Sequence, residues 1–220
     1  MPRWSTCCDG KSAAGRAQAS KTELRGSSRA SNFPIESIDM PNEASLKSAG
    51  RELLDRIGAV MDKVDWASFV EMARMLPRAR RTFVTGAGRS GLVARSFGMR
   101  LMHAGLPVFV PGETITPAAG DGDVLVAISC TGQTGYTEYL ARRARELGAK
   151  VVVLTAEPDS PLARDADKIV AIPATAEDIV VRAAVFEHAA SLCLDAVFNV
   201  LAERLKLDLD EYRKRHANLE

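Results

Sequence analysis

The stretch DVLVAISCTGQTGYTE, residues 123–138, decides the fold. Its first half is an apolar run with the length of a buried strand. Its second half is a loop of hydroxyl residues and glycines that leads into a helical pattern. A strand followed by a polar loop and a helix is half of a crossover unit, in which the helix returns the chain to a parallel neighbouring strand. The stretch therefore predicts a parallel sheet with binding loops at the carboxyl ends of its strands.

The same alternation runs through the middle of the chain. Short apolar runs bounded by turn residues recur at residues 82–85, 108–110, 124–128, 151–154 and 169–172. Between them lie two helical patterns, residues 91–103 and 136–147, each closed by a glycine. Strands that alternate with helices predict an α/β fold, namely a three-layer α/β/α sandwich around a five-stranded, mostly parallel sheet.

Four further helical patterns flank this core. Apolar residues at helical spacing predict helices over 42–64 and, with Asp65 as the N-cap, over 65–76. A long apolar helix over 178–205 and a short one over 208–215 follow the last strand. The helices over 42–64 and 178–205 are apolar on more than one face, which predicts a homo-oligomer.

Residues 1–39 differ from the rest in composition. They are rich in Ser, Ala and Gly and show no apolar periodicity, so they cannot offset the entropy of ordering. We favour a disordered leader, or a start assigned too far upstream with Met40 as the true first residue; an organelle transit peptide is the alternative. Residues 40–220 are expected to form a single domain.

Composition argues against several classes of function. Lys and Arg number 29 against 28 Asp and Glu, so a net charge of +1 gives no reason to expect nucleic acid or an anionic membrane as a partner. No run approaches the roughly 18 uninterrupted apolar residues of a membrane span. The four cysteines form no CxxC pair and the three histidines lack ligand spacing, so we expect no metal site. A reducing, cytoplasmic setting fits this cysteine usage.

Two loops at predicted strand ends suit a phosphate. Residues 86–91, GAGRSG, fit GxGxxG, and Gly88, Arg89 and Ser90 of this glycine loop would face an anion at a helix N-terminus. Alone, the glycine loop also fits a dinucleotide cofactor. The hydroxyl loop, residues 129–137, carries five hydroxyl side chains, more than a helix cap needs, and so predicts a site for one phosphate monoester. Its expected ligand-binding side chains are Ser129, Thr131, Gln133 and Thr134.

Together, the two loops and the alternation resemble the sugar isomerase (SIS) domain, which binds phosphosugars. Residues 88–117, GRSGLVARSFGMRLMHAGLPVFVPGETITP, and the terminal RHANLE are similar to the 6-phospho-3-hexuloisomerase family within it. The resemblance spans residues 43–220. It implies a homotetrameric enzyme without a cofactor that converts D-arabino-hex-3-ulose 6-phosphate to fructose 6-phosphate, in formaldehyde fixation by the ribulose monophosphate pathway or in pentose supply. A 3-hexulose-6-phosphate synthase would make the substrate.

The chain departs from that family in two places. The family's hydroxyl loop usually reads SGSGET, whereas SCTGQT here has Cys130 for glycine and Gln133 for glutamate. A Gln-Pro-(Met/Leu)-Gly-Ser run usually precedes the last long helix, where residues 180–185 here read VVRAAV. Both departures fall in the sugar-contacting region, so the exact sugar phosphate stays open. An SIS isomerase for another sugar, such as arabinose 5-phosphate, is an alternative.

Moving a carbonyl from C3 to C2 needs a base that takes the C2 proton, gives a cis-enediol and returns the proton at C3. Glu187 is our candidate base, because helical spacing places it on a largely apolar stripe whose burial would raise its pKa. The resemblance supports it through the Phe-Glu pair of this helix. His188 lies on a more polar stripe and is interpreted as a surface residue.

Two other histidines are candidates. His103 shares a stripe with Leu92, Ser96 and Met99, a placement more typical of a core histidine. The resemblance matches it to the family's RLMH histidine and implies an acid/base role on the sugar oxygens. His216 lies in the terminal HANLE, and in related sugar isomerases a C-terminal residue completes a neighbouring subunit's site.

Two other classes of function compete with an isomerase. A non-catalytic phosphosugar sensor would use the same domain, but such regulators usually carry an N-terminal helix-turn-helix, and residues 1–64 show no three-helix basic unit. An oxidoreductase would bind a dinucleotide at the glycine loop, but the hydroxyl loop takes up the space that the second nucleotide of the cofactor would need. A ketose phosphate isomerase fits the loops best.

Overall fold

The structure, a computed structural model, describes residues 40–219. Its five strands are β1 (Thr82–Gly86), β2 (Val108–Phe109), β3 (Val124–Ile128), β4 (Lys150–Thr155) and β5 (Lys168–Ala171). They form one sheet in the order β2-β1-β3-β4-β5, and each neighbouring pair is parallel. The predicted five-stranded α/β sandwich is confirmed. The expected leader, residues 1–39, lies outside the described residues, and so do Cys7 and Cys8.

Helices begin where the sequence offers polar caps. Asn42 accepts a hydrogen bond from the amide of Ser45, and Asp65 and Asp178 cap their helices in the same way. The described helices are α1 (Glu43–Met61), α2 (Trp66–Met75), α3 (Gly88–His103), α4 (Gly135–Glu146), α5 (Ile179–Arg204) and α6 (Leu209–Lys214), with short 3-10 turns η2 (Leu76–Arg78) and η3 (Leu162–Asp165). All six predicted helices are therefore present, within three residues of their expected starts.

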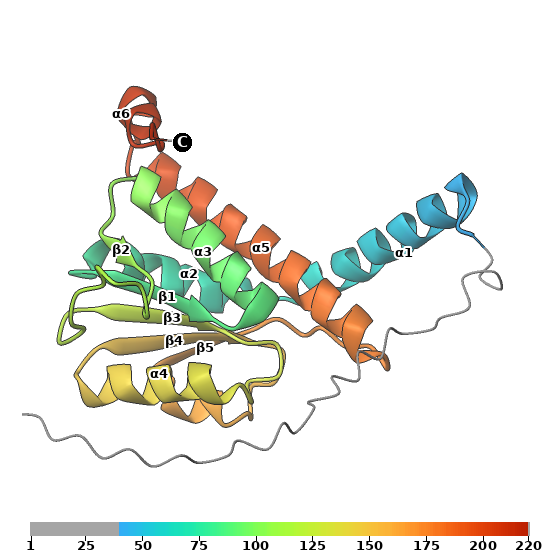
Figure 1. The fold of residues 1–220 in the computed structure, drawn as a ribbon, viewed down its shortest axis with the longest axis horizontal. Helices are drawn as coiled ribbons and strands as arrows, with labels where there is room; N and C mark the ends of the chain where they lie inside the picture. The colour runs from blue at the N-terminus through green and yellow to red at the C-terminus, as the bar shows by residue number, and fades with distance from the viewer. Residues whose placement is uncertain (1–39, 220) are drawn as a thin grey trace, which may run out of the picture. The chain divides into compact units, whose positions relative to one another are not determined.

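The sheet separates two apolar clusters. Successive β3 side chains point to opposite faces, so Val126 joins the cluster of α2, α3 and α5 whereas Leu125 and Ala127 join the cluster of α4. Figure 1 shows the resulting layers, with α3 and α5 on one side of the sheet and α4 on the other. Both faces are covered, which explains why β3 is apolar throughout.

The long helix α5 is the most apolar element. Among residues 40–219 it is the one helix long and apolar enough to cross a membrane, and half of its most apolar stretch is buried in the fold. It packs against α3, α1 and α2, and Cys193 Sγ lies 3.5 Å from Met61 Sδ of α1. Packing on the sheet and three helices accounts for its composition.

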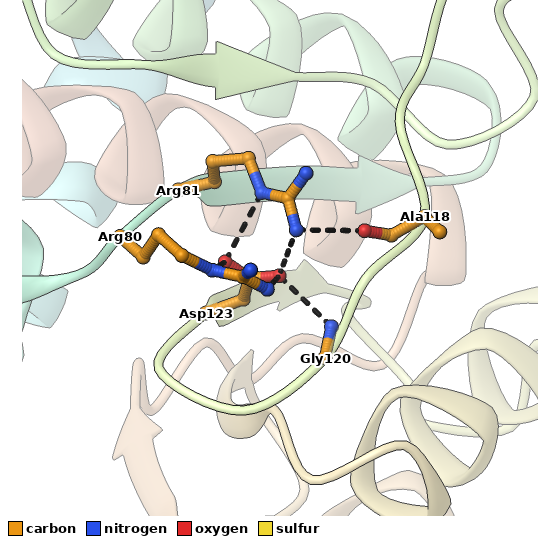
Figure 2. Close-up of polar contacts among 5 residues, drawn as sticks. All are labelled: Arg80, Arg81, Ala118, Gly120 and Asp123. Atoms are coloured by element: carbon orange, nitrogen blue, oxygen red, sulfur yellow. Dashed lines mark hydrogen bonds and ion pairs between the residues drawn. The ribbon is translucent and has the colours of Figure 1, made fainter.

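A buried carboxylate ties together the amino ends of β1 and β3. Asp123 is fully buried and accepts hydrogen bonds from the guanidinium groups of Arg80 and Arg81 at 2.9–3.2 Å, as Figure 2 shows. It also accepts from the amide of Gly120 at 2.8 Å, while Arg81 donates to the carbonyl of Ala118. Three partners compensate the desolvated charge, so this cluster fixes the end of the sheet opposite the two loops.

Candidate active site

The glycine loop and the hydroxyl loop meet where the strand order reverses. β1 continues through α3 to β2, on one side, and β3 continues through α4 to β4, on the other. β1 and β3 are hydrogen-bonded neighbours, with Gly86 opposite Ile128. In open parallel sheets, ligands bind in the crevice outside the carboxyl ends of such a strand pair. The structure therefore brings both predicted loops to one crevice.

The glycines of the glycine loop allow α3 to pack closely against β1. A Cβ on Gly91 would lie 2.6 Å from the carbonyl oxygen of Gly86, so α3 can approach β1 this closely only without a side chain there. Gly88 has a φ of 56°, in the left-handed region. Ser90 is buried, whereas the side chain of Arg89 is more than half exposed in the crevice region. Arg89 is thus the side chain of this loop that can reach a ligand.

The hydroxyl loop is folded around its own side chains. Ser129 is buried, and its Oγ accepts from the amide of Gly132 at 3.1 Å and lies 3.2 Å from Thr134 Oγ1. Thr131 Oγ1 accepts from the amide of Gln133 at 3.3 Å. Thr134 is the N-cap of α4, but its side chain makes no capping bond, so amides at the start of α4 stay available to an anion.

Two of the five expected hydroxyl groups do not join this group. Thr137 is fully buried in α4, and its hydroxyl has no hydrogen-bond partner within residues 40–219. Tyr136 is half exposed, and its hydroxyl lies against Gly112 on the far side of the crevice. The phosphate site is therefore narrower than the sequence suggested. Of the predicted hydroxyl groups, those of Ser129, Thr131 and Thr134 lie at the loop beside the first amides of α4 and remain the candidates for holding a phosphate.

The predicted base lies at the same crevice. The Glu187 side chain is 13% exposed, and its Oε2 lies 3.0 Å from Nε of Arg89 in the glycine loop. Burial raises the pKa of the Glu187 carboxyl, while the charges of Arg89 and His188 lower it in part. His188 is exposed, as expected. A partly enclosed carboxylate with a raised pKa is suited to act as a general base.

Three charged side chains act on the Cys130 thiol, and two of them, Arg182 and Glu157, were not singled out by the sequence. Burial raises the pKa of this thiol, the charge of Arg182 lowers the pKa, and the charges of Glu187 and Glu157 raise it. Arg182 forms an ion pair with Glu157, from the loop after β4. Glu187 therefore lies near the hydroxyl loop as well as near Arg89. The one sequence signal for Arg182 is its place in the altered segment 180–185.

A cavity of about 250 Å³ lies at the carboxyl end of β1, where Gly86 and Gly91 of the glycine loop line it together with the polar side chains of Arg95, Glu113 and Tyr136. Glu187 and the hydroxyls of Ser129, Thr131 and Thr134 are not part of its lining. A cavity of about 270 Å³ between α4 and the sheet is lined mainly by apolar side chains and lacks the loop hydroxyls. In the described part of the chain, no cluster of three His, Cys, Asp or Glu residues could hold a metal ion.

The structure does not bring His103 to this crevice. His103 ends α3, whereas Arg89 begins it, and fourteen residues of helix separate them by about 21 Å. Within one chain, the structure thus separates His103 from the candidate base, and its expected role on the sugar oxygens stays a prediction. Its ring is buried in a stack on His216, with centroids 4.0 Å apart and Tyr212 edge-on.

This histidine pair belongs to the contact between α6 and α3. Arg215 donates to the carbonyl of His103 at 3.2 Å, which holds α6 against the end of α3. Burial lowers the pKa of His103, and the charge of His216 lowers it further, which favours the neutral ring. His103 and His216 thus lie together, apart from the Glu187 of their own chain.

Comparison with known proteins identifies the fold family. The SIS domain model matches residues 75–198, which include both loops, α3, α4 and Glu187. The chain belongs to the SIS domain family. The resemblance expected from the sequence is thereby confirmed.

Several SIS relatives carry one name. The 3-hexulose-6-phosphate isomerase of Mycobacterium gastri is 37% identical over 192 residues, covering 81% of this chain and 96% of that protein. The protein of the same name from Bacillus subtilis is 35% identical and covers 68% and 85%. A solved Methanococcus jannaschii protein, inferred to have 3-hexulose-6-phosphate isomerase function, is 29% identical with a TM-score of 0.70, covering 76% and 97%.

Proposed function

We propose that this SIS domain interconverts D-arabino-hex-3-ulose 6-phosphate and fructose 6-phosphate. The observation that carries the proposal is Glu187, a partly enclosed carboxylate with a raised pKa, at the crevice that the hydroxyl loop also borders. The naming of the bacterial relatives supports the choice of sugar. The pathway and a 3-hexulose-6-phosphate synthase partner follow from that choice and form part of the proposal.

The hydroxyl loop would hold the phosphate. The hydroxyls of Ser129, Thr131 and Thr134 and the free amides of α4 are donors to its oxygens, and the helix N-terminus adds partial positive charge. Gln133 is exposed at the mouth of the loop, where its amide can donate to a sugar oxygen. Anchoring the phosphate directs the carbon chain toward Glu187.

Glu187 would move the proton. Its carboxylate takes the proton from C2 of the 3-hexulose while the C3 carbonyl oxygen gains a proton, which gives the 2,3-enediol. The same carboxyl group then returns its proton to C3 as the C2 hydroxyl loses one, so that C2 becomes the carbonyl carbon. One base serves both carbons because they are adjacent. Arg89 keeps the carboxylate ionised and oriented.

The chain would work as an oligomer, which we propose to be a tetramer. Leu46 and Leu54 of α1 and Ile179 and Val180 of α5 are exposed apolar side chains on helices beside the crevice end of the fold. Burial of such residues favours association of subunits. A neighbouring subunit is then the source from which His103 or His216 would reach the sugar. A light-scattering mass near 23.7 kDa, that of one chain, would contradict this part.

Deuterium exchange tests the reaction itself. Fructose 6-phosphate is incubated with the protein in D₂O, and the position of the label is read by NMR. Label at C3 supports the 2,3-enediol, whereas label at C1 identifies a 1,2-isomerase. Binding of the sugar with no label at either carbon would identify a phosphosugar sensor instead.

A further inference from the structure

A chain of hydrogen bonds links the hydroxyl loop to the end of β4. The carbonyl oxygen of Cys130 accepts from Thr155 Oγ1 at 3.2 Å and from the amide of Ala156 at 3.0 Å. Thr155 Oγ1 in turn accepts from the amide of Glu157 at 3.1 Å. Thr155 is fully buried, so these bonds are shielded from water. Glu157 is thereby fixed relative to the loop proposed to bind phosphate.

Arg182 extends this chain to α5. Its Nη2 forms an ion pair with Glu157 Oε1, and its Nε donates to the carbonyl of Ala174 at 3.0 Å. The Arg182 side chain is 20% exposed and that of Glu157 is 45% exposed, so the pair is shielded from solvent mainly on its arginine side. Arg182 stands in the first turn of α5, and Glu187 follows five residues later on the same rigid helix.

The first part of α5 is thus held from two sides. Arg89 of the glycine loop contacts Glu187 directly, and Glu157, tied to the hydroxyl loop, contacts Arg182. Ile179 and Val180 are exposed, whereas Val181 packs against the core and Val185 and Phe186 are buried in it. This apolar packing holds α5 on the sheet, and the Arg182–Glu157 pair adds a polar link between the first turn of α5 and the segment that is hydrogen-bonded to the hydroxyl loop.

We propose that Arg182 is a positioning residue, which sets the separation between the Glu187 carboxylate and the phosphate held by the hydroxyl loop. This inference rests on the proposed function for the identity of the reaction. Its physical basis is that a misplacement of about 1 Å between a catalytic group and its substrate can cost about 100-fold in rate. Arginine suits the role because its planar fork reaches two acceptors in fixed directions, which lysine cannot do.

Three variants that weaken the pair, and a conservative replacement, Arg182→Lys, test its role. Arg182→Met removes the charge and both hydrogen bonds, Glu157→Gln weakens the pair more gently, and the third variant combines them. We expect kcat of Arg182→Met to fall about 10- to 100-fold with KM within about threefold of wild type. The double variant should be no slower than Arg182→Met, because the two substitutions remove the same interaction. Arg182→Lys should recover part of the rate.

Arg143→Met is the matched control. Arg143 also forms an ion pair, with Glu146 at 2.9 Å, but on the exposed surface of α4. Its kcat and KM should equal those of the wild type. A raised KM with unchanged kcat in Arg182→Met would show that Arg182 contacts the sugar phosphate, and unchanged kcat and KM would show that the pair has no role. Either result overturns the positioning role.

Hydrogen exchange of the backbone separates this inference from the proposed function. Arg182→Met should lose protection jointly in residues 129–134 and 180–187, whereas Arg143→Met should not. If the wild type fails to exchange the C3 proton but the joint loss is seen, the proposed reaction is wrong and the link between loop and helix stands. Protection that stays at the wild-type level in both segments overturns the link itself.

Discussion

Nε of Arg89 lies 3.0 Å from Oε2 of Glu187, so one ion pair joins the glycine loop at the start of α3 to the only carboxylate proposed to move a proton. Burial raises the pKa of Glu187 and Arg89 opposes that rise. Together, these opposed effects on the pKa suit the Glu187 carboxylate to accept a proton as a general base.

Replacing Glu187 with Gln should abolish most of the activity. The variant keeps the size and hydrogen bonding of the side chain but removes the base, so kcat should fall by about 10²- to 10⁴-fold with KM nearly unchanged. Deuterium incorporation at C3 of fructose 6-phosphate should fall in parallel. His188→Gln, at the adjacent exposed position, should stay near the wild-type rate. Loss of activity in His188→Gln instead of Glu187→Gln would assign the base to His188.

Removing Arg89 should shift the pH profile. Arg89 lowers the pKa of Glu187, so Arg89→Met should raise it, and the carboxylate form needed for proton abstraction should appear at higher pH. The acid limb of kcat/KM against pH should therefore move upward. Arg100→Met is the control, because Arg100 also links α3 to α5, through Asp195 at 2.7 Å. Equal shifts in both variants would rule out a specific effect of Arg89.

A negative charge in the hydroxyl loop should repel the phosphate. Ser129 and Thr134 lie 3.2 Å apart, so Ser129→Asp or Thr134→Asp places a carboxylate where the anion is proposed to bind. Because the added carboxylate repels the phosphate, KM should rise at least tenfold, which corresponds to a loss of about 1.4 kcal/mol in binding free energy. Ser96→Asp adds the same charge on an exposed face of α3 and should leave KM unchanged. Wild-type KM values in both loop variants would place the phosphate elsewhere.

The Asp123 cluster should govern acid stability without affecting catalysis. Burial alone would raise the pKa of Asp123, but hydrogen bonds from Arg81, Arg80 and the Gly120 amide lower it overall. A lowered pKa stabilises the fold above the unfolded value near 4, and that stabilisation is lost as pH falls through the lower folded value.

Asp123→Asn should therefore melt several degrees below wild type at pH 7. Breaking an enclosed pair costs about 3–5 kcal/mol, and solvent at the half-exposed Arg80 side chain should reduce this to about 2 kcal/mol. The difference in Tm between the two proteins should shrink below about pH 4. Thermal melts across pH measure this, and kcat should be unchanged. A Tm gap that does not narrow at all between pH 7 and pH 3 would exclude the charge as its cause.

Local patterns predicted the sheet well because its signals are local. β3 begins and ends where expected, since five apolar residues are bounded by Asp123 and Ser129. α3 starts at Gly88, three residues before the expected Gly91, because the glycine loop has no periodicity to mark the first turn. β2 is two residues long, at the sheet edge, where few contacts specify its length.

The site was less predictable because it depends on distant segments. The stripe through Leu92 and Met99 is exposed, and His103 is buried by Tyr212 and His216 of the C-terminal segment. Spacing along a helix gives the face of a residue but not which later segment covers it. Glu157 and Arg182 are 25 positions apart and meet through the order of β4 and β5, which residue spacing does not encode.

The candidate site has two halves, the hydroxyl loop with the start of α4 and Glu187 on α5. The helices α4 and α5 cover opposite faces of the sheet. Besides the Arg182–Glu157 pair, the packing of the β3 side chains against the helices on both faces of the sheet contributes to the distance between these two halves. Protein interiors are packed densely enough that one methylene more or less is felt by its neighbours. Substitutions of buried residues such as Val126 or Ala127 can thus alter the catalytic rate although these residues do not contact the substrate. The packing of the core is then one determinant of turnover.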